Sequence, residues 1–136
     1  MDVNKYLNGI DIIYWINLER SEKRRNNMIN MFKYINVPNQ RSVACDGITS
    51  NEIMNNFQIS IKKGNNIIYA TLLSHLNTIK NFSKSSYNIA LICEDDINLE
   101  FSKYWDKTIQ EIIDNAPNDW EIIMLSYTLC GNQLQT

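Results

Sequence analysis

The first half of the chain alternates short apolar runs with a segment of helical periodicity. Residues 10–18 are rich in β-branched and aromatic side chains, which predicts a strand. A helix follows, with Ser21 as its candidate N-cap and an apolar face that extends to Ile35. Residues 42–45 form a second short apolar run that ends in a turn, whereas 50–63 fit either a short helix or a loop. The apolar positions of the first helix are Met28, Met31, Phe32 and Ile35.

The second half has clearer periodicity. Residues 66–82 predict a long amphipathic helix, and 87–93 predict a continuous apolar strand of the kind found in the middle of a parallel sheet. Residues 101–116 predict a third helix, 120–126 predict a fourth strand, and the polar residues 127–136 are typical of a frayed tail. The expected apolar face of the long helix consists of Ile68, Leu72, Leu76 and Ile79.

This order of elements predicts the fold class. Strands that alternate with helices are typical of an α/β protein with a mostly parallel, Rossmann-like sheet and right-handed crossovers. The length of 136 residues suits one domain, residues 1–136, large enough to bury a core without disulfides.

Charge, cysteine usage and hydropathy exclude several function classes. The net charge of −2 provides no basic stripe for nucleic acid and no cationic face for a membrane. Cys45, Cys93 and Cys130 are odd in number and far apart, so neither a disulfide framework nor a zinc site is predicted. The sequence shows no signal peptide and no membrane-spanning segment. We therefore expect a cytoplasmic or other reducing compartment.

Three adjacent acids provide the strongest chemical signal. The apolar run 89–93 stops on Glu94, Asp95 and Asp96, where ligands bind in open α/β sheets. Adjacent carboxylates repel one another, and a hard cation such as Mg²⁺ or Mn²⁺ would offset that cost. A solvated acidic turn is the simpler alternative.

Arginines and a turn follow the other two predicted strands. Arg20 and Arg24 come just after the first strand, and a guanidinium binds phosphate or stacks on a base. Asp46 could accept a hydrogen bond from a ribose or base, and Gly47 allows close approach of the backbone. The alternatives are a solvated helix face for the arginines and an ordinary turn for Asp46 and Gly47.

His75, the only histidine, lies beside the expected apolar face of the long helix. It could bind phosphate or orient an acidic side chain, although a hydrogen-bonded structural histidine is the more common outcome. Ser74 and His75 do not form a nucleophile pair, because adjacent helical residues do not face each other.

Four motifs follow one another along the chain: residues 16–20 with Lys23-Arg24-Arg25, residues 44–47, residues 73–75 and residues 90–97. Taken together and in order, they resemble glycosyltransferase family 25, whose members are lipopolysaccharide and collagen galactosyl- or glucosyltransferases. The first looks like the opening signature of that family, and the second is similar to its Ala-x-Asp-Gly element. The third is similar to its Leu-Ser-His helix, and the fourth to its strand that ends in Glu-Asp-Asp. The resemblance covers essentially the whole chain.

The resemblance implies a GT-A-like fold that binds a UDP-hexose through a divalent ion, Mn²⁺ or Mg²⁺. It also implies transfer of the sugar to a hydroxyl of a glycan or of hydroxylysine in a protein acceptor. It assigns no catalytic base. The residues expected to bind the nucleotide sugar are Asn17, Leu18, Arg20, Arg24, Asp46, Gly47, Ser74, His75, Glu94 and Asp95. Those expected to bind the metal are Asp96 and Glu94.

The chain departs from the family pattern in two ways. Ile68 occupies the position of a family glutamate, next to the milder changes Ala70 and Thr71. The sequence also ends soon after the fourth predicted strand, so we expect a fold truncated on its carboxy-terminal side, without the segment that builds an acceptor site. Such a truncation would leave an exposed edge that self-association could cover. The alternative function is therefore a degenerate, non-catalytic nucleotide-sugar-binding or protein-interaction module. A phosphotransfer receiver fits poorly, because Asn17-Leu18-Glu19 lacks the acidic pair expected after the first strand.

Overall fold

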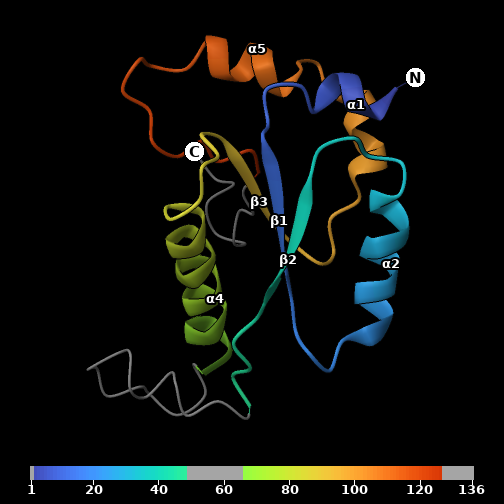
Figure 1. Cartoon of the computed structure of the whole chain (residues 1–136), viewed down its shortest axis with the longest axis vertical. Helices are drawn as coiled ribbons and strands as arrows, with labels where there is room; N and C mark the ends of the chain where they lie inside the picture. The colour runs from blue at the N-terminus through green and yellow to red at the C-terminus, as the bar shows by residue number, and fades with distance from the viewer. Residues whose placement is uncertain (1, 49–65, 127–136) are drawn as a thin grey trace, which may run out of the picture.

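In the part of the chain that the structure describes, three parallel strands form a central sheet (Figure 1). The computed structural model describes residues 2–48 and 66–126. The strands are β1 (Ile12–Asn17), β2 (Asn39–Val43) and β3 (Ala90–Glu94), and they lie in the order β2-β1-β3. The helices are α1 (Val3–Tyr6), α2 (Glu22–Phe32), α4 (Asn66–Phe82), the 3₁₀ helix η1 (Leu99–Tyr104) and α5 (Ile109–Asp114).

The register of the sheet brings its three carboxyl ends to one edge. Ile16 of β1 pairs with Ser42 on one side and with Glu94 on the other. All three strands therefore end at the lower edge of the sheet in Figure 1, where the connection from β1 to α2 also lies. The predicted α/β class with a parallel sheet flanked by helices is confirmed, and the arrangement is consistent with a GT-A-like fold.

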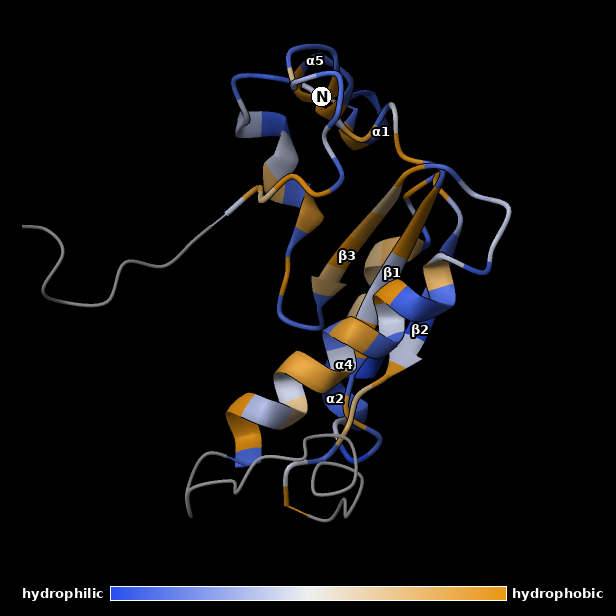
Figure 2. Cartoon of the chain, turned by 90° about the vertical axis from the view of Figure 1, so that its left-hand side faces the viewer, coloured by the Kyte–Doolittle hydropathy of each residue, from blue (hydrophilic) through white to orange (hydrophobic). Residues whose placement is uncertain are grey.

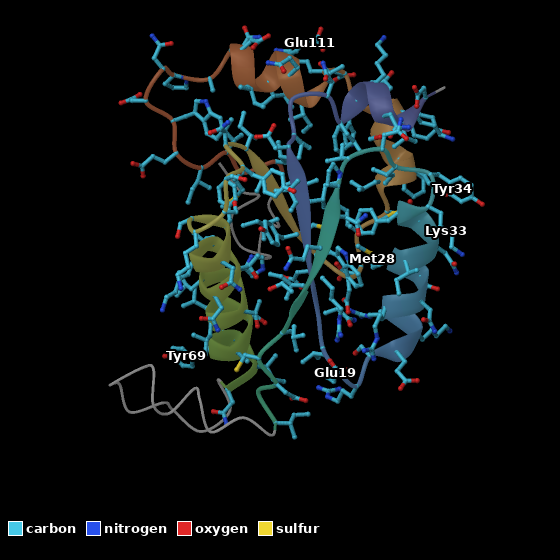
Figure 3. The ribbon with its side chains drawn as sticks, viewed as in Figure 1. Glu19, Met28, Lys33, Tyr34, Tyr69 and Glu111 are labelled. Atoms are coloured by element: carbon cyan, nitrogen blue, oxygen red, sulfur yellow. The ribbon has the colours of Figure 1, made fainter. Side chains whose placement is uncertain are left out.

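Helices cover both faces of the sheet. In Figure 2, α4 lies in front of the strands and α2 lies behind them. Every residue of β1 is buried, because β1 is the central strand and is covered on both faces. Figure 3 shows Met28 pointing from α2 toward the sheet, where it joins the main core. The predicted apolar face of α2 is confirmed: Met28, Phe32 and Ile35 are buried in that core, and Met31 packs against it. Ser21 is at the N-cap position, but its side chain makes no capping hydrogen bond.

The predicted buried face of α4 is wrong. Ile68, Leu72, Leu76 and Ile79 are 67%, 46%, 47% and 38% exposed. The sheet-facing side consists of smaller and more polar residues, and hydrogen bonds explain the choice. Ser42 of β2 bonds the Thr78 hydroxyl at 2.6 Å, and the backbone N–H of Cys45 donates to Ser74 Oγ at 2.9 Å. The residues that α4 buries are Ala70, Leu73, Ser74 and Thr78.

The region after β3 also differs from the prediction. The helix expected over 101–116 is divided into η1 and α5, because Thr108 forms a capping box with Glu111 and starts a new helix. The strand expected over 120–126 pairs with no strand in the described residues, and Ile122 is 77% exposed.

The bounds of two strands shift from the prediction. The second strand occupies Asn39–Val43 rather than 42–45, and the third occupies Ala90–Glu94 rather than 87–93. Pairing with β1 fixes both bounds, which local hydrophobicity cannot do. The ambiguous residues 50–63 and the tail 127–136 lie outside the described residues. Within 2–48 and 66–126, no helix has both the length and the apolar character that crossing a bilayer requires.

Candidate functional site

A cleft of about 160 Å³ opens at the carboxyl edge of the sheet. Four stretches of sequence contribute to its walls: the end of β1 with the start of α2, the loop after β2, the first half of α4, and the end of β3. Of the residues predicted to bind a nucleotide sugar, those lining the cleft are Leu18, Arg20, Arg24, Asp46, Gly47, Ser74, His75, Glu94 and Asp95. Asn17 and Asp96 are not among the lining residues.

Asn17 is a buried residue beneath the cleft whose side chain bonds three other residues. Its side chain is only 1% exposed, and its Nδ2 donates to Asp95 Oδ2 at 2.6 Å and to the Ser21 carbonyl at 3.2 Å. Its Oδ1 accepts a hydrogen bond from Arg41 Nε at 2.9 Å. The side chain of Asn17 therefore links the end of β1 to Arg41 of β2 and to Asp95, the residue after β3.

Asp95 is held on both of its oxygens. Arg24 Nη1 donates to Oδ1 at 2.9 Å, and Asn17 donates to Oδ2. The carboxylate is 9% exposed, whereas the Arg24 side chain is 57% exposed. The hydrogen bond to Asp95 and the charge of that carboxylate raise the pKa of Arg24. Asp95 thus positions Arg24 at the mouth of the cleft.

A second arginine–carboxylate pair lies across the cleft. Arg20 Nε donates to Asp46 Oδ2 at 2.8 Å, and Asp46 raises the pKa of Arg20 through this hydrogen bond and its charge. The other oxygen of Asp46 accepts the Ile48 N–H at 2.9 Å. Gly47 lies against the start of α4: a Cβ added there would lie 2.8 Å from the Asn66 carbonyl oxygen. A side chain does not fit at position 47 without a shift of the backbone.

Ser74 and His75 have different surroundings despite their adjacency. The Ser74 hydroxyl donates to the Ala70 carbonyl at 2.6 Å and accepts the Cys45 N–H, so its hydrogen bonds connect α4 to the loop after β2. His75 Nε2 lies 3.2 Å from Glu94 Oε1, and both side chains are partly exposed. His75 therefore contacts the first acid of the Glu-Asp-Asp motif.

Oxygen ligands for a cation are available at Glu94 and Asp96. Glu94 is half exposed and Asp96 is exposed just beyond β3, whereas Asp95 is already held by Asn17 and Arg24. Within the described ranges, no three His, Cys, Asp or Glu side chains converge to hold a metal on their own. Two carboxylates suit Mg²⁺ or Mn²⁺ in sites where phosphate oxygens of a substrate and water complete the shell.

The sequence analysis missed a layer of charge behind the cleft. Glu19 accepts hydrogen bonds from Arg25 at 2.9 Å and from Arg41 at 2.8 Å, and these bonds lower the pKa of Glu19. Glu19 is labelled at the lower edge of Figure 3, beside the start of α2. Arg25 belongs to the first motif and was available as a signal, but Arg41 lies inside a strand and carries no local signal.

The chain matches a family model. The model is described as glycosyltransferase family 25 (LPS biosynthesis protein), and it matches residues 10–131. That range includes every residue that lines the cleft. No curated protein and no solved structure matches the chain.

Proposed function

The chain belongs to glycosyltransferase family 25, and we propose that its cleft binds a UDP-hexose together with Mn²⁺ or Mg²⁺. The hexose is then transferred to a hydroxyl of a glycan or of hydroxylysine. Family membership supports glycosyl transfer, with a nucleotide sugar and an acceptor as the partners. The choice of UDP-hexose, metal and acceptor is our proposal.

One observation carries this proposal. The four motif segments are far apart in the sequence, yet they line one cleft at the carboxyl ends of three parallel strands. This edge is where open α/β sheets bind nucleotides. If the four motifs served only to stabilise the fold, they would not need to line the same cleft.

The charges of the cleft favour a divalent cation. Its lining includes the cations Arg20 and Arg24 and the carboxylates of Asp46, Glu94 and Asp95. Arg20 is paired with Asp46 and Arg24 with Asp95, so neither arginine neutralises Glu94. These five side chains together therefore carry a net negative charge. A diphosphate needs additional positive charge to bind here, and a divalent ion on Glu94 and Asp96 would supply it.

The arginines keep donors for the phosphates. Arg20 bonds Asp46 through Nε and Nη2, which leaves the Nη1 protons, and Arg24 bonds Asp95 through Nη1, which leaves Nε and Nη2. Both side chains are more than half exposed at the mouth of the cleft. Carboxylates that fix a guanidinium reduce the entropy lost when it binds phosphate.

The proposed reaction is a substitution at the anomeric carbon. The bond from that carbon to the phosphate oxygen breaks, and the nucleoside diphosphate leaves with the electron pair. The acceptor hydroxyl oxygen forms the new bond to the carbon, and its proton passes to solvent water. A divalent ion held by Glu94 and Asp96 would stabilise the charge that develops on the diphosphate. Arg20 and Arg24 orient the same group through hydrogen bonds.

Calorimetric titration of UDP with and without Mn²⁺, alongside GDP, tests the proposal. We expect UDP to bind, the affinity to require the metal, and GDP to bind more weakly. If a folded sample binds neither nucleotide in the presence of Mn²⁺, the proposal is wrong.

An exposed apolar row on α4 favours the alternative of a protein-interaction module. The row consists of Ile68, Leu72, Leu76 and Ile79. Ile68 replaces the family glutamate and is itself part of that row, at 67% exposure. Under this alternative the row mediates contact with another protein or a second copy of the chain. Light scattering of the purified protein, combined with an assay of UDP-hexose turnover, separates the two functions: an oligomer without turnover favours the module.

A further inference from the structure

A second hollow, of about 480 Å³, lies between β2 and the carboxyl-terminal half of α4. It shares no lining residue with the cleft at the sheet edge. α4 and β2 form the two sides of this groove. The polar side chains that line it include Gln40 and Ser42 from β2 and Asn77, Lys80, Asn81 and Lys84 from α4 and its end.

The groove is cationic. Lys80 and Lys84 are four residues apart, so they lie on the same side of the helix end. Among residues 2–48 and 66–126, no aspartate or glutamate lines the groove. Arg41 also lines it, but its guanidinium is bonded to Asn17 and Glu19 and does not add a free charge. The two ammonium groups repel each other, and an anion between them would remove that repulsion.

The remaining polar groups suit sugar hydroxyls. The side-chain amides of Gln40, Asn77 and Asn81 make no hydrogen bond with any residue in 2–48 or 66–126, and each offers both donors and an acceptor. Thr78 donates its proton to the Ser74 carbonyl, so Ser42 must donate to Thr78. Ser42 Oγ thus keeps acceptor capacity for a ligand hydroxyl.

We propose that this groove binds an anionic saccharide, with its carboxylate or phosphate between Lys80 and Lys84 and its hydroxyls on the amides. Binding itself does not depend on the donor cleft. In the proposed reaction this saccharide would be part of the acceptor, and that assignment rests on the proposed glycosyl transfer. The two sources of negative charge, a sugar acid and a sugar phosphate, share the same recognition chemistry.

Titrations of the ¹⁵N-labelled chain with glucuronic acid and with glucose 6-phosphate test the proposal. We expect both to shift the amide signals of β2 and of residues 77–84, and the tighter of the two identifies the natural anion. Neutral glucose and inorganic phosphate should each bind about tenfold more weakly or worse, because each lacks half of the contacts. The double variant Lys80→Gln/Lys84→Gln should lose about tenfold in affinity for the charged sugars. The control Lys33→Gln/Lys107→Gln, which removes two exposed lysines elsewhere, should lose none.

Two results would overturn the groove site. One is unchanged affinity in the Lys80→Gln/Lys84→Gln variant, and the other is inorganic phosphate binding as tightly as glucose 6-phosphate, which would indicate an adventitious ion only. Titration of UDP with Mn²⁺ into the same variants separates this proposal from the proposed function. A chain that binds UDP but neither charged sugar refutes the groove alone. A chain that binds the sugars through Lys80 and Lys84 but not UDP supports the groove while it refutes the donor cleft.

Discussion

Asn17 and Asp95 are joined by a hydrogen bond of 2.6 Å between the side-chain amide of one and the carboxylate of the other. The first residue ends the central strand and the second follows the edge strand β3. Because Asn17 is 1% exposed and Asp95 is nearly buried, this bond is protected from water. It fixes the Glu-Asp-Asp motif to the middle of the sheet.

We predict that Asn17→Asp lowers the free energy of unfolding at pH 7 by about 1–3 kcal/mol, since it removes a buried donor and sets two carboxylates against each other. Urea unfolding at pH 7 measures this effect, with the exposed Asn26→Asp as the control. An unchanged free energy of unfolding in Asn17→Asp would contradict the repulsion argument.

Gly47 makes a steric prediction. A methyl group at this position would meet the backbone of Asn66 at 2.8 Å, so Gly47→Ala must displace the loop that carries Asp46. We expect a loss of stability of about 1–3 kcal/mol and weaker binding of UDP, measured by thermal unfolding and calorimetry. Ile48→Ala removes atoms from a side chain that is 73% exposed, so it should leave the stability within about 0.5 kcal/mol. Equal stability of the two variants would show that the loop with Asp46 moves aside at no cost in free energy.

Two adjacent leucines on α4 should lose very different amounts of unfolding free energy when each is truncated to alanine. Leu73 is 5% exposed and belongs to a cluster with Ala70 and Cys45, whereas Leu72 is 46% exposed on the outer face. Leu73→Ala should cost about 2–4 kcal/mol of unfolding free energy, and Leu72→Ala should cost at most about 0.5 kcal/mol. Chemical denaturation of both variants measures the difference. A large loss for Leu72→Ala would mean that a partner surface covers the outer face.

The sequence predicts the parts of the molecule that depend on local periodicity and on strand direction. The helix over 66–82 has the predicted bounds, because a regular apolar repeat needs no tertiary information to form a helix. The meeting of Arg20, Asp46 and Glu94 at one cleft follows from the parallel arrangement alone, since parallel strands end at the same edge.

What the sequence does not predict depends on tertiary contacts. α4 has apolar residues on more than one side, and the hydrogen bonds of Thr78 and Ser74 to β2 and its loop select the buried side. The apolar run 120–126 resembles a strand, but a strand requires a neighbour, and none pairs with it in the described residues. Likewise, the pairing of Asp95 with Arg24 spans 71 residues and leaves no pattern in the sequence.

Asp96 separates metal binding from folding. The side chain is exposed and makes no hydrogen bond within the described residues, so Asp96→Ala should leave the unfolding free energy within about 0.5 kcal/mol. We expect the same variant to abolish the Mn²⁺-dependent binding of UDP in calorimetry, because it removes one of the two carboxylates available to the ion. Asp106→Ala, at another exposed aspartate, is the matched control. Unchanged Mn²⁺-dependent affinity in Asp96→Ala would refute the assignment of this ligand.

Cys93 provides a test of the core beside the acidic motif. Its thiol is 8% exposed and contacts the Tyr14 carbonyl oxygen at 3.6 Å. Burial, followed by the charges of Asp96 and Glu94, raises the pKa of Cys93 from 9.0 to about 12. The thiolate is the reactive form, so Cys93 should resist iodoacetamide at pH 8 in the folded chain and react in urea, as measured by peptide mass spectrometry.

The raised pKa of Cys93 also sets the sign of a stability change. The unfolded thiol loses its proton near pH 9.0, whereas the folded thiol keeps its proton until about pH 12. Stability from this group is therefore complete below pH 9.0 and declines as the pH rises toward 12, because only the unfolded chain gains from deprotonation in that window. Urea unfolding at pH 8 and pH 10 should show the decline, and Cys93→Ala should remove this part of it. A wild-type chain with the same pH slope as Cys93→Ala would mean that the thiol is not shielded by the sheet.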